Sequence, residues 1–317
     1  MDLEKMKQKF KDHKATFTDY GNIKILDFKK PNSTEYRIRF LFEEDYYRLH
    51  ISGDLGQLTA TNYCNMCWNG FKDFVDGRGY CYDDNGHGTH VTGIICSNGT
   101  IKGIAPDAQV AAIKVLDREG NGKTNRVLQA LEWIQEYKKK YAIRILNFSV
   151  GFLPGAESEE QKLIVDKLEQ LWDDNMIVVA AAGNNGPSEG SVTVPGISRK
   201  IITVGANDDK NPGRFMPKAY SGQGPTECCI VKPEILAPGT NMISLDRNNH
   251  YVRKSGTSMA TPVVSGAIAL ALQKNPGLRP EEIKLKLYES VEKNEGMRGG
   301  YTKAWGNLHV DNLLHLI

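Results

Sequence analysis

Two patterns of apolar and polar positions divide the chain near residue 70. Before it, Tyr36–Phe42 and Tyr47–Ser52 alternate apolar with charged residues, which is typical of half-exposed strands in an antiparallel sheet. Ile23–Phe28 is a third candidate strand, and Leu3–Lys14 has apolar residues at helical spacing. We therefore expect residues 1–70 to form a small α+β segment.

After residue 85, apolar strands alternate with amphipathic helices. Such alternation indicates a mostly parallel sheet with helices on both faces, a doubly wound α/β fold. Met176–Ala182 is apolar throughout, as a strand buried on both faces requires. The expected strands are Val110–Val115, Ile143–Val150, Met176–Ala182 and Ile201–Ala206, and the expected helices are Asn125–Lys140, Glu159–Asn175 and Ser258–Gln273.

Charge and composition narrow the classes of function. The 317 residues include 40 lysines and arginines against 38 acidic residues, a net charge of +2, which argues against a nucleic-acid-binding protein. No apolar run approaches the roughly 18–20 residues of a membrane helix, so we expect no membrane partner. The highly charged opening segment does not resemble a signal peptide, and we expect a cytoplasmic protein.

The six cysteines do not predict a metal or disulfide framework. Cys64 and Cys67 have CxxC spacing, which fits either a zinc knuckle or a redox pair. A zinc site needs four ligands, and no second CxxC or HxxxH follows nearby. We expect reduced thiols and no metal site.

Three motifs carry candidate chemistry. His87 lies in Asp83–His90 (DDNGHGTH), where flanking glycines leave its imidazole accessible at a helix start. Ser258 lies in Ser255–Pro262 (SGTSMATP), in the first turn of an apolar helix, where N–H groups favour developing negative charge. Asn184 follows the most apolar strand, at the carboxyl end where ligands bind in α/β sheets. Each motif alone also fits a structural cap or turn.

Taken together and in this order, the three motifs resemble those of the subtilase family of serine endopeptidases. The resemblance covers about residues 71–317 and implies a subtilisin-like peptidase domain there, with residues 1–70 as a segment of unknown role. Further matches are Lys114–Leu116 with Gly120–Gly122, Asn147–Gly151, Thr193–Gly196, Ser221–Pro225, Lys232–Ile235 and Ala237–Gly239.

The resemblance implies a role for each motif residue. Ser258 would attack the peptide carbonyl, His87 would act as general base, and Asn184 would stabilise the oxyanion. A peptide or unfolded protein substrate would lie between two edges formed by Gly120, Asn121, Gly122, Ser149, Val150 and Gly151. No cofactor is required. Calcium often stabilises this family, but no acidic loop here gives a set of ligands, and the sequence implies no oligomeric state.

The family also has an aspartate roughly 30 residues before the histidine. Asp54 lies 33 residues before His87 and is followed by Leu-Gly, which keeps an Asp-x-Gly frame. The preceding segment is amphipathic, however, whereas the strand of the family is aliphatic throughout. Two hypotheses follow. Either Asp54 completes the triad, or residues 1–70 are joined to a subtilase without its first strand, which would be impaired or inactive and at most bind peptides.

Overall fold

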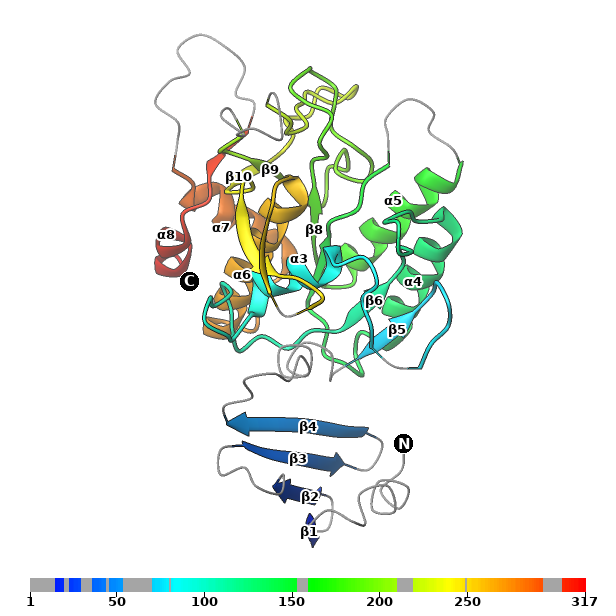
Figure 1. The fold of residues 1–317 in the computed structure, drawn as a ribbon. Helices are drawn as coiled ribbons and strands as arrows, with labels where there is room; N and C mark the ends of the chain where they lie inside the picture. The colour runs from blue at the N-terminus through cyan, green and yellow to red at the C-terminus, as the bar shows by residue number, and fades with distance from the viewer. Residues whose placement is uncertain are drawn as a thin grey trace. The chain divides into compact units, whose positions relative to one another are not determined.

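The computed structural model describes residues 15–19, 23–29, 36–43, 46–53, 70–79, 81–152, 159–209, 219–248, 250–292 and 304–317. Contacts divide the chain into two units (Figure 1). Unit 1 is Met1–Lys72 with Gly79–Cys81 and Gln109–Ala112. Unit 2 is Asp73–Arg78, Tyr82–Ala108 and Ile113–Ile317.

Unit 1 contains a four-stranded antiparallel sheet with the strand order β1-β2-β3-β4. The register of β3 and β4 pairs Phe40 with Leu49 and Phe42 with Tyr47, so the alternating apolar positions of the two strands oppose one another. The strands are β1 (Ala15–Asp19), β2 (Ile23–Lys29), β3 (Tyr36–Glu43) and β4 (Tyr46–Gly53). The strands expected at Ile23–Phe28, Tyr36–Phe42 and Tyr47–Ser52 are confirmed as β2, β3 and β4, and β1 is an addition. The helix expected at Leu3–Lys14 lies outside the described residues.

The main sheet of unit 2 has five parallel strands in the order β13-β10-β9-β8-β7. The strands are β7 (Ile145–Phe148), β8 (Ile177–Ala181), β9 (Ile202–Ala206), β10 (Ile235–Ala237) and β13 (Gly306–Asn307). Every residue of β8 and β9 is buried, which explains why their sequences carry no polar alternation. The mostly parallel α/β fold expected from the sequence is confirmed.

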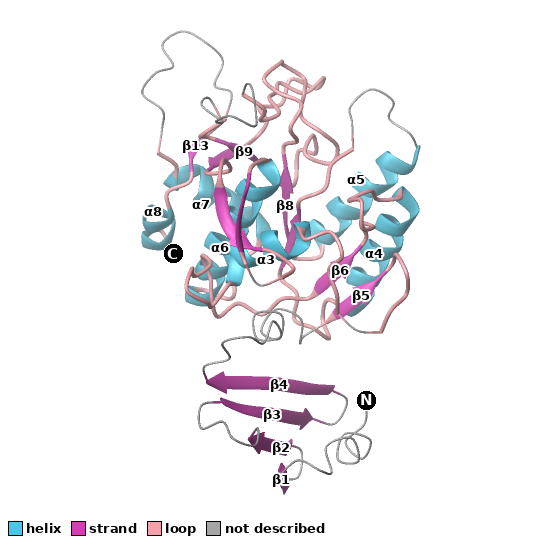
Figure 2. Cartoon of the chain, in the orientation of Figure 1, coloured by secondary structure: helices cyan, strands magenta, loops and turns pink. Residues whose placement is uncertain are grey.

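Helices cover this sheet (Figure 2). They are α3 (His87–Cys96), α4 (Thr124–Tyr137), α5 (Glu159–Asp173), α6 (Thr257–Lys274), α7 (Pro280–Ser290) and α8 (Val310–His315). The apolar α6 packs against β7, β8, β9 and β10, and α3 packs against α6. Helix α5 packs against β8 and α4. In the described parts of the chain, no helix is both long and apolar enough to cross a membrane.

Two small sheets complete the architecture. β11 (Met242–Leu245) and β12 (Tyr251–Lys254) form an antiparallel hairpin that leads into α6. β5 (Phe71–Asp73) pairs with β6 (Ala112–Lys114) outside the five-stranded sheet. The sequence predicted a buried strand over Val110–Val115, but β6 is shorter and only half-buried. Among the described strands, β6 pairs only with β5, so it lacks the second neighbouring strand of a central buried strand.

Candidate active site

Ser258 lies in the first turn of α6, directly after the hairpin β11–β12. Gly256 precedes the helix with a φ of 149°, and a Cβ there would come within 3.2 Å of Asn184 Nδ2. A glycine therefore lets the chain pass close to the asparagine and turn into the helix. Ser258 Oγ donates to the backbone carbonyl of Ser149 at 3.3 Å.

The proline of this motif changes the hydrogen bonding of the first turns of α6. Pro262 lies inside α6, beyond the four N–H groups that lack an intrahelical acceptor. Because proline has no N–H, the carbonyl of Ser258 loses its usual i+4 donor. Ser149 Oγ donates to that carbonyl at 3.1 Å instead. Ser149 and Ser258 are thus joined by two reciprocal hydrogen bonds.

Asn184 follows β8 and contacts the residue just before the serine. Its Oδ1 accepts from the backbone N–H of Thr257 at 2.9 Å and from Thr257 Oγ1 at 3.1 Å. A backbone N–H can only donate, so the amide oxygen must face Thr257 and Nδ2 must point the other way. The side chain is exposed. Asn184 Nδ2 and the N–H of Ser258 can therefore serve as two donors for an oxyanion.

His87 is the first residue of α3. Its backbone N–H donates to Asn85 Oδ1 at 3.1 Å, after Gly86 with a φ of 90°. Asp83 holds the preceding turn: its carboxylate accepts from the N–H groups of Asn85 and Gly86 and from the N–H and hydroxyl of Thr89. This carboxylate therefore holds the turn that leads into α3 and caps its first turn through Thr89.

The electrostatic surroundings of His87 favour the neutral imidazole. Burial lowers the pKa of His87, the Lys254 ammonium lowers it further, and the Asp83 carboxylate opposes both effects. Lys254 Nζ donates to the carbonyl of Gly86 at 3.0 Å, so this cation lies beside the histidine. A neutral imidazole is the form that can accept a proton.

His90, in the same motif, has a structural position. It is fully buried, and its Nε2 lies 3.1 Å from the Met242 carbonyl and 3.2 Å from the Val252 carbonyl. Two carbonyl oxygens require Nε2 to carry a proton and donate. Burial lowers the pKa of His90 to about 4, so it stays neutral while it joins α3 to both strands of the hairpin.

Hydrogen bonds connect the first predicted substrate edge to the turn before His87 and the second edge to Ser258. Asn85 Nδ2 donates to the carbonyl of Arg118 at 3.0 Å, which connects the His87 turn to the loop that carries Gly120–Gly122. That loop is exposed and is closed by a bridge between Leu116 and Gly122. The second edge, Ser149–Gly151, follows β7 and contacts Ser258 through Ser149.

Two expectations for the site remain without a structural description. Asp54, the candidate orienting acid, lies outside the described residues. Across the described ranges, no group of three or more His, Cys, Asp or Glu side chains is placed to hold a metal ion, and we assign no calcium ligands.

The geometry agrees with comparisons to known proteins. A model of the subtilase family matches residues 55–312. The chain belongs to the subtilase family. The match begins within the segment 1–70 that the sequence had set apart.

Relatives at the level of sequence are bacterial proteases. The serine protease AprX of Bacillus subtilis (strain 168) is 38% identical over 250 residues, which are 71% of this chain and 57% of AprX. Subtilisin DY of Bacillus licheniformis is 36% identical over 257 residues, 79% of this chain and 86% of that protein. The chain thus spans little more than half the length of AprX. These relatives support a serine-type peptidase.

Solved structures show the same fold. Sphericase superimposes with a TM-score of 0.65 at 30% identity, covering 76% of this chain and 85% of that protein. A cold adapted subtilisin-like serine proteinase gives a TM-score of 0.60 at 28% identity, covering 75% of this chain and 80% of the other. This subtilase therefore has a subtilisin-like α/β fold, as the resemblance implied.

Sequence reasoning missed three residues that shape the site. Thr257 orients the Asn184 amide, and its place beside the serine could have marked it. Asn85 connects the turn before His87 to the loop of the first substrate edge. Its polar side chain inside the motif Asp83–His90 could have indicated this role. Lys254 had no local signal, because its contact with Gly86 joins positions 168 residues apart.

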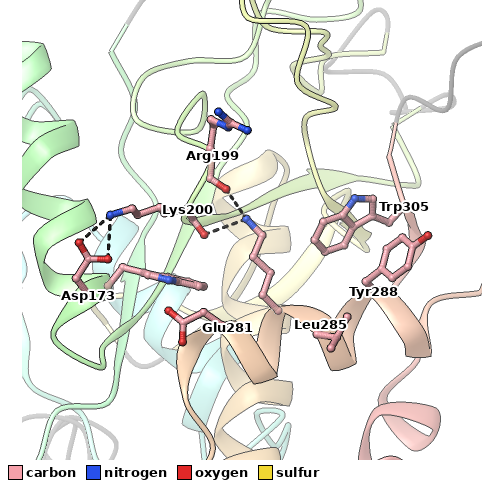
Figure 3. Close-up of a pocket in the computed structure, with 9 residues that line it drawn as sticks. Asp173, Arg199, Lys200, Glu281, Leu285, Tyr288 and Trp305 are labelled. Carbon is pink, nitrogen blue, oxygen red and sulfur yellow. Dashed lines mark hydrogen bonds and ion pairs between the residues drawn. The ribbon is translucent and has the colours of Figure 1, made fainter.

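A separate cavity of this subtilase, of about 490 Å³, lies where α5 and α7 meet the loop before β9 (Figure 3). Both lysines of its lining already have partners. Lys200 pairs with Asp173 at 2.7 Å, and Lys284 donates to the carbonyls of Arg199 and Lys200 at 2.7 and 2.9 Å. These contacts hold α7 against the sheet, so we read the cavity as structural.

Proposed function

We propose that this subtilase is a serine endopeptidase that hydrolyses peptide bonds through an acyl-enzyme. Ser258 Oγ attacks the carbonyl carbon while His87 takes the hydroxyl proton. The tetrahedral intermediate then expels the amine, which receives that proton from His87. A water molecule then attacks the ester carbonyl while His87 takes one of its protons. The bond to Ser258 Oγ breaks, Oγ receives that proton from His87, and the carboxylic acid product is released.

The orientation of Asn184 is the observation that carries this proposal. Thr257 holds the amide oxygen with two hydrogen bonds, which directs the Nδ2 donor away from Thr257. The N–H of Ser258 lies in the first turn of α6, where the helix dipole favours negative charge. Both donors are fixed before a substrate arrives, so they need no reorganisation when the oxyanion forms.

The two edges would hold the substrate as an extended strand. Gly120–Gly122 and Ser149–Gly151 offer backbone groups on exposed or half-buried segments, which suits a peptide or an unfolded protein rather than a folded surface. A cytoplasmic location remains a prediction of the sequence. We also propose that residues 1–70 form a segment apart from the peptidase domain at 71–317, supported by their own antiparallel sheet.

A serine-directed fluorophosphonate tests the proposal, because it labels only an activated serine. We expect the folded wild type to be labelled and Ser258→Ala to remain unlabelled. Ser255→Ala, three residues earlier, is the matched control and should label like the wild type. Failure of the well-folded wild type to label would overturn the peptidase and leave a protein that at most binds peptides.

The same assay tests Asp54 as the orienting acid. A carboxylate that holds the catalytic histidine in its productive tautomer contributes about 10⁴-fold to turnover in serine proteases. If Asp54 has this role, Asp54→Asn should label far more slowly than the wild type. Equal labelling of both proteins would remove Asp54 from the triad.

A further inference from the structure

One cation beside the catalytic residues is half-buried and has no ion pair among the described residues. Lys254 ends β12, four positions before Ser258. Its Nζ donates to the carbonyl of Gly86, the residue that precedes His87, at 3.0 Å. An ammonium has three N–H donors, so this contact leaves two of them for another acceptor.

The acidic residues around Lys254 are engaged elsewhere. Asp83 caps the turn before α3. Asp84 pairs with Lys114 at 2.5 Å, and Asp246 accepts from the N–H groups of Asn248 and His250 at 2.8 Å each. By contrast, four lysines that are at most 17% exposed each have a carboxylate partner: Lys114, Lys138, Lys232 and Lys284.

A half-buried charge without a partner is destabilising unless an opposite charge reaches it. Burial lowers the pKa of Lys254, whereas Asp83 and Asp246 raise it only from a distance. A bound carboxylate would remove this penalty. Lys254 therefore has the properties of a site for an anionic group that arrives with a ligand.

The mechanism indicates where on the substrate that group would be. His87 hands its proton to the leaving amine, so the side of the site next to Gly86 and His87 faces the residue that follows the scissile bond. We propose that Lys254 binds the side-chain carboxylate of an aspartate or glutamate at that position, and that this subtilase prefers substrates with an acidic residue there. This inference rests on the proposed function.

A bound carboxylate would also assist the chemical step. The Lys254 charge opposes the imidazolium that His87 becomes in the transition state. Pairing Lys254 with a substrate carboxylate would neutralise this repulsion while the proton is on His87. Interactions that strengthen in the transition state raise kcat, so the preference should appear in kcat as well as in KM.

Two peptides that differ only in Glu or Gln directly after the scissile bond test the proposal. We expect the full-length wild type to cleave the Glu peptide with a kcat/KM about 2–5 times higher at low salt, with a smaller ratio at high salt, as for a partly exposed ion pair. Lys254→Gln should cleave both equally. Lys254→Glu should prefer a third peptide with Lys at that position.

Arg253→Gln is the matched control. Arg253 is the neighbouring cation on β12, but it is exposed and its guanidinium donates to the carbonyl of Asn241 at 3.3 Å. This variant should keep the wild-type ratio. Circular dichroism shows whether the Lys254 variants fold. If they do not, the ratio of kcat/KM for the Glu and Gln peptides in the wild type still tests the proposal.

Equal cleavage of the Glu and Gln peptides by the wild type would overturn the proposal. So would a preference that persists in folded Lys254→Gln. A wild type that cleaves neither peptide and takes no fluorophosphonate label would instead refute the peptidase function, and with it the inference that rests on it.

Discussion

The buried Glu234 carboxylate compensates the charges of two lysines. The stability of this subtilase should therefore depend on the negative charge of this one side chain. Glu234 Oε1 lies 2.6 Å from Lys232 Nζ and 2.9 Å from Lys284 Nζ, and Oε2 accepts from the N–H of Thr203 at 2.8 Å. The Lys232 side chain is 0% exposed, and that of Glu234 is 3% exposed. Burial lowers the pKa of Lys232, and the Glu234 carboxylate opposes that shift.

Glu234→Gln keeps the volume and an acceptor for the Thr203 N–H but removes the charge. Lys284 is 17% exposed and keeps hydrogen bonds to three backbone carbonyls, so losing its ion pair with Glu234 should cost little stability. Lys232 would retain only the Ile201 carbonyl and Thr203 Oγ1. Leaving one charge of a buried pair uncompensated costs about 3–5 kcal/mol. We expect the free energy of unfolding to fall by that amount.

Urea unfolding followed by circular dichroism at the helical signal measures this change, because all the described helices lie in unit 2. A Ser258→Ala background removes the proposed nucleophile, so self-cleavage does not contribute to the signal. Glu281→Gln is the control: Glu281 is exposed in the first turn of α7, and its substitution should change stability by no more than about 0.5–1 kcal/mol.

A loss below about 1 kcal/mol in Glu234→Gln would refute the argument that Glu234 compensates a buried charge. The double variant Lys232→Met, Glu234→Gln gives a second check. It leaves no uncompensated buried charge, so it should recover part of the stability that the single variant loses.

Three further predictions concern the site. Thr257→Val should lower kcat about tenfold with little change in KM, since one of two hydrogen bonds that orient Asn184 is lost; unchanged steady-state kinetics would contradict it. Lys254→Gln removes a positive charge and raises the pKa of His87, so the acid limb of the kcat/KM–pH profile should move to higher pH, and a move to lower pH would refute the stated electrostatics. His90→Phe should lower the free energy of unfolding by about 1–3 kcal/mol in urea titrations, because two buried carbonyls lose their donor, and an unchanged midpoint would argue against that role.

Local patterns were sufficient for much of the fold. The alternation in β3 and β4 and the apolar run of β8 each predicted a strand that the structure contains, since side chains alternate between the faces of a sheet. The His87, Asn184 and Ser258 motifs were visible for a similar reason. Each consists of glycines and a functional residue at the end of an element, within a few positions of one another.

The sequence by itself determined the class of fold, the family resemblance and the three candidate catalytic positions. Only the tertiary structure decided how those positions are oriented. Asn184 and Thr257 are 73 residues apart, and Lys254 and Gly86 are 168 apart. Such contacts depend on how parallel strands and the hairpin bring distant segments together, and no local period encodes them. The charge beside His87 is therefore a property of the folded chain, which the order of residues alone did not reveal.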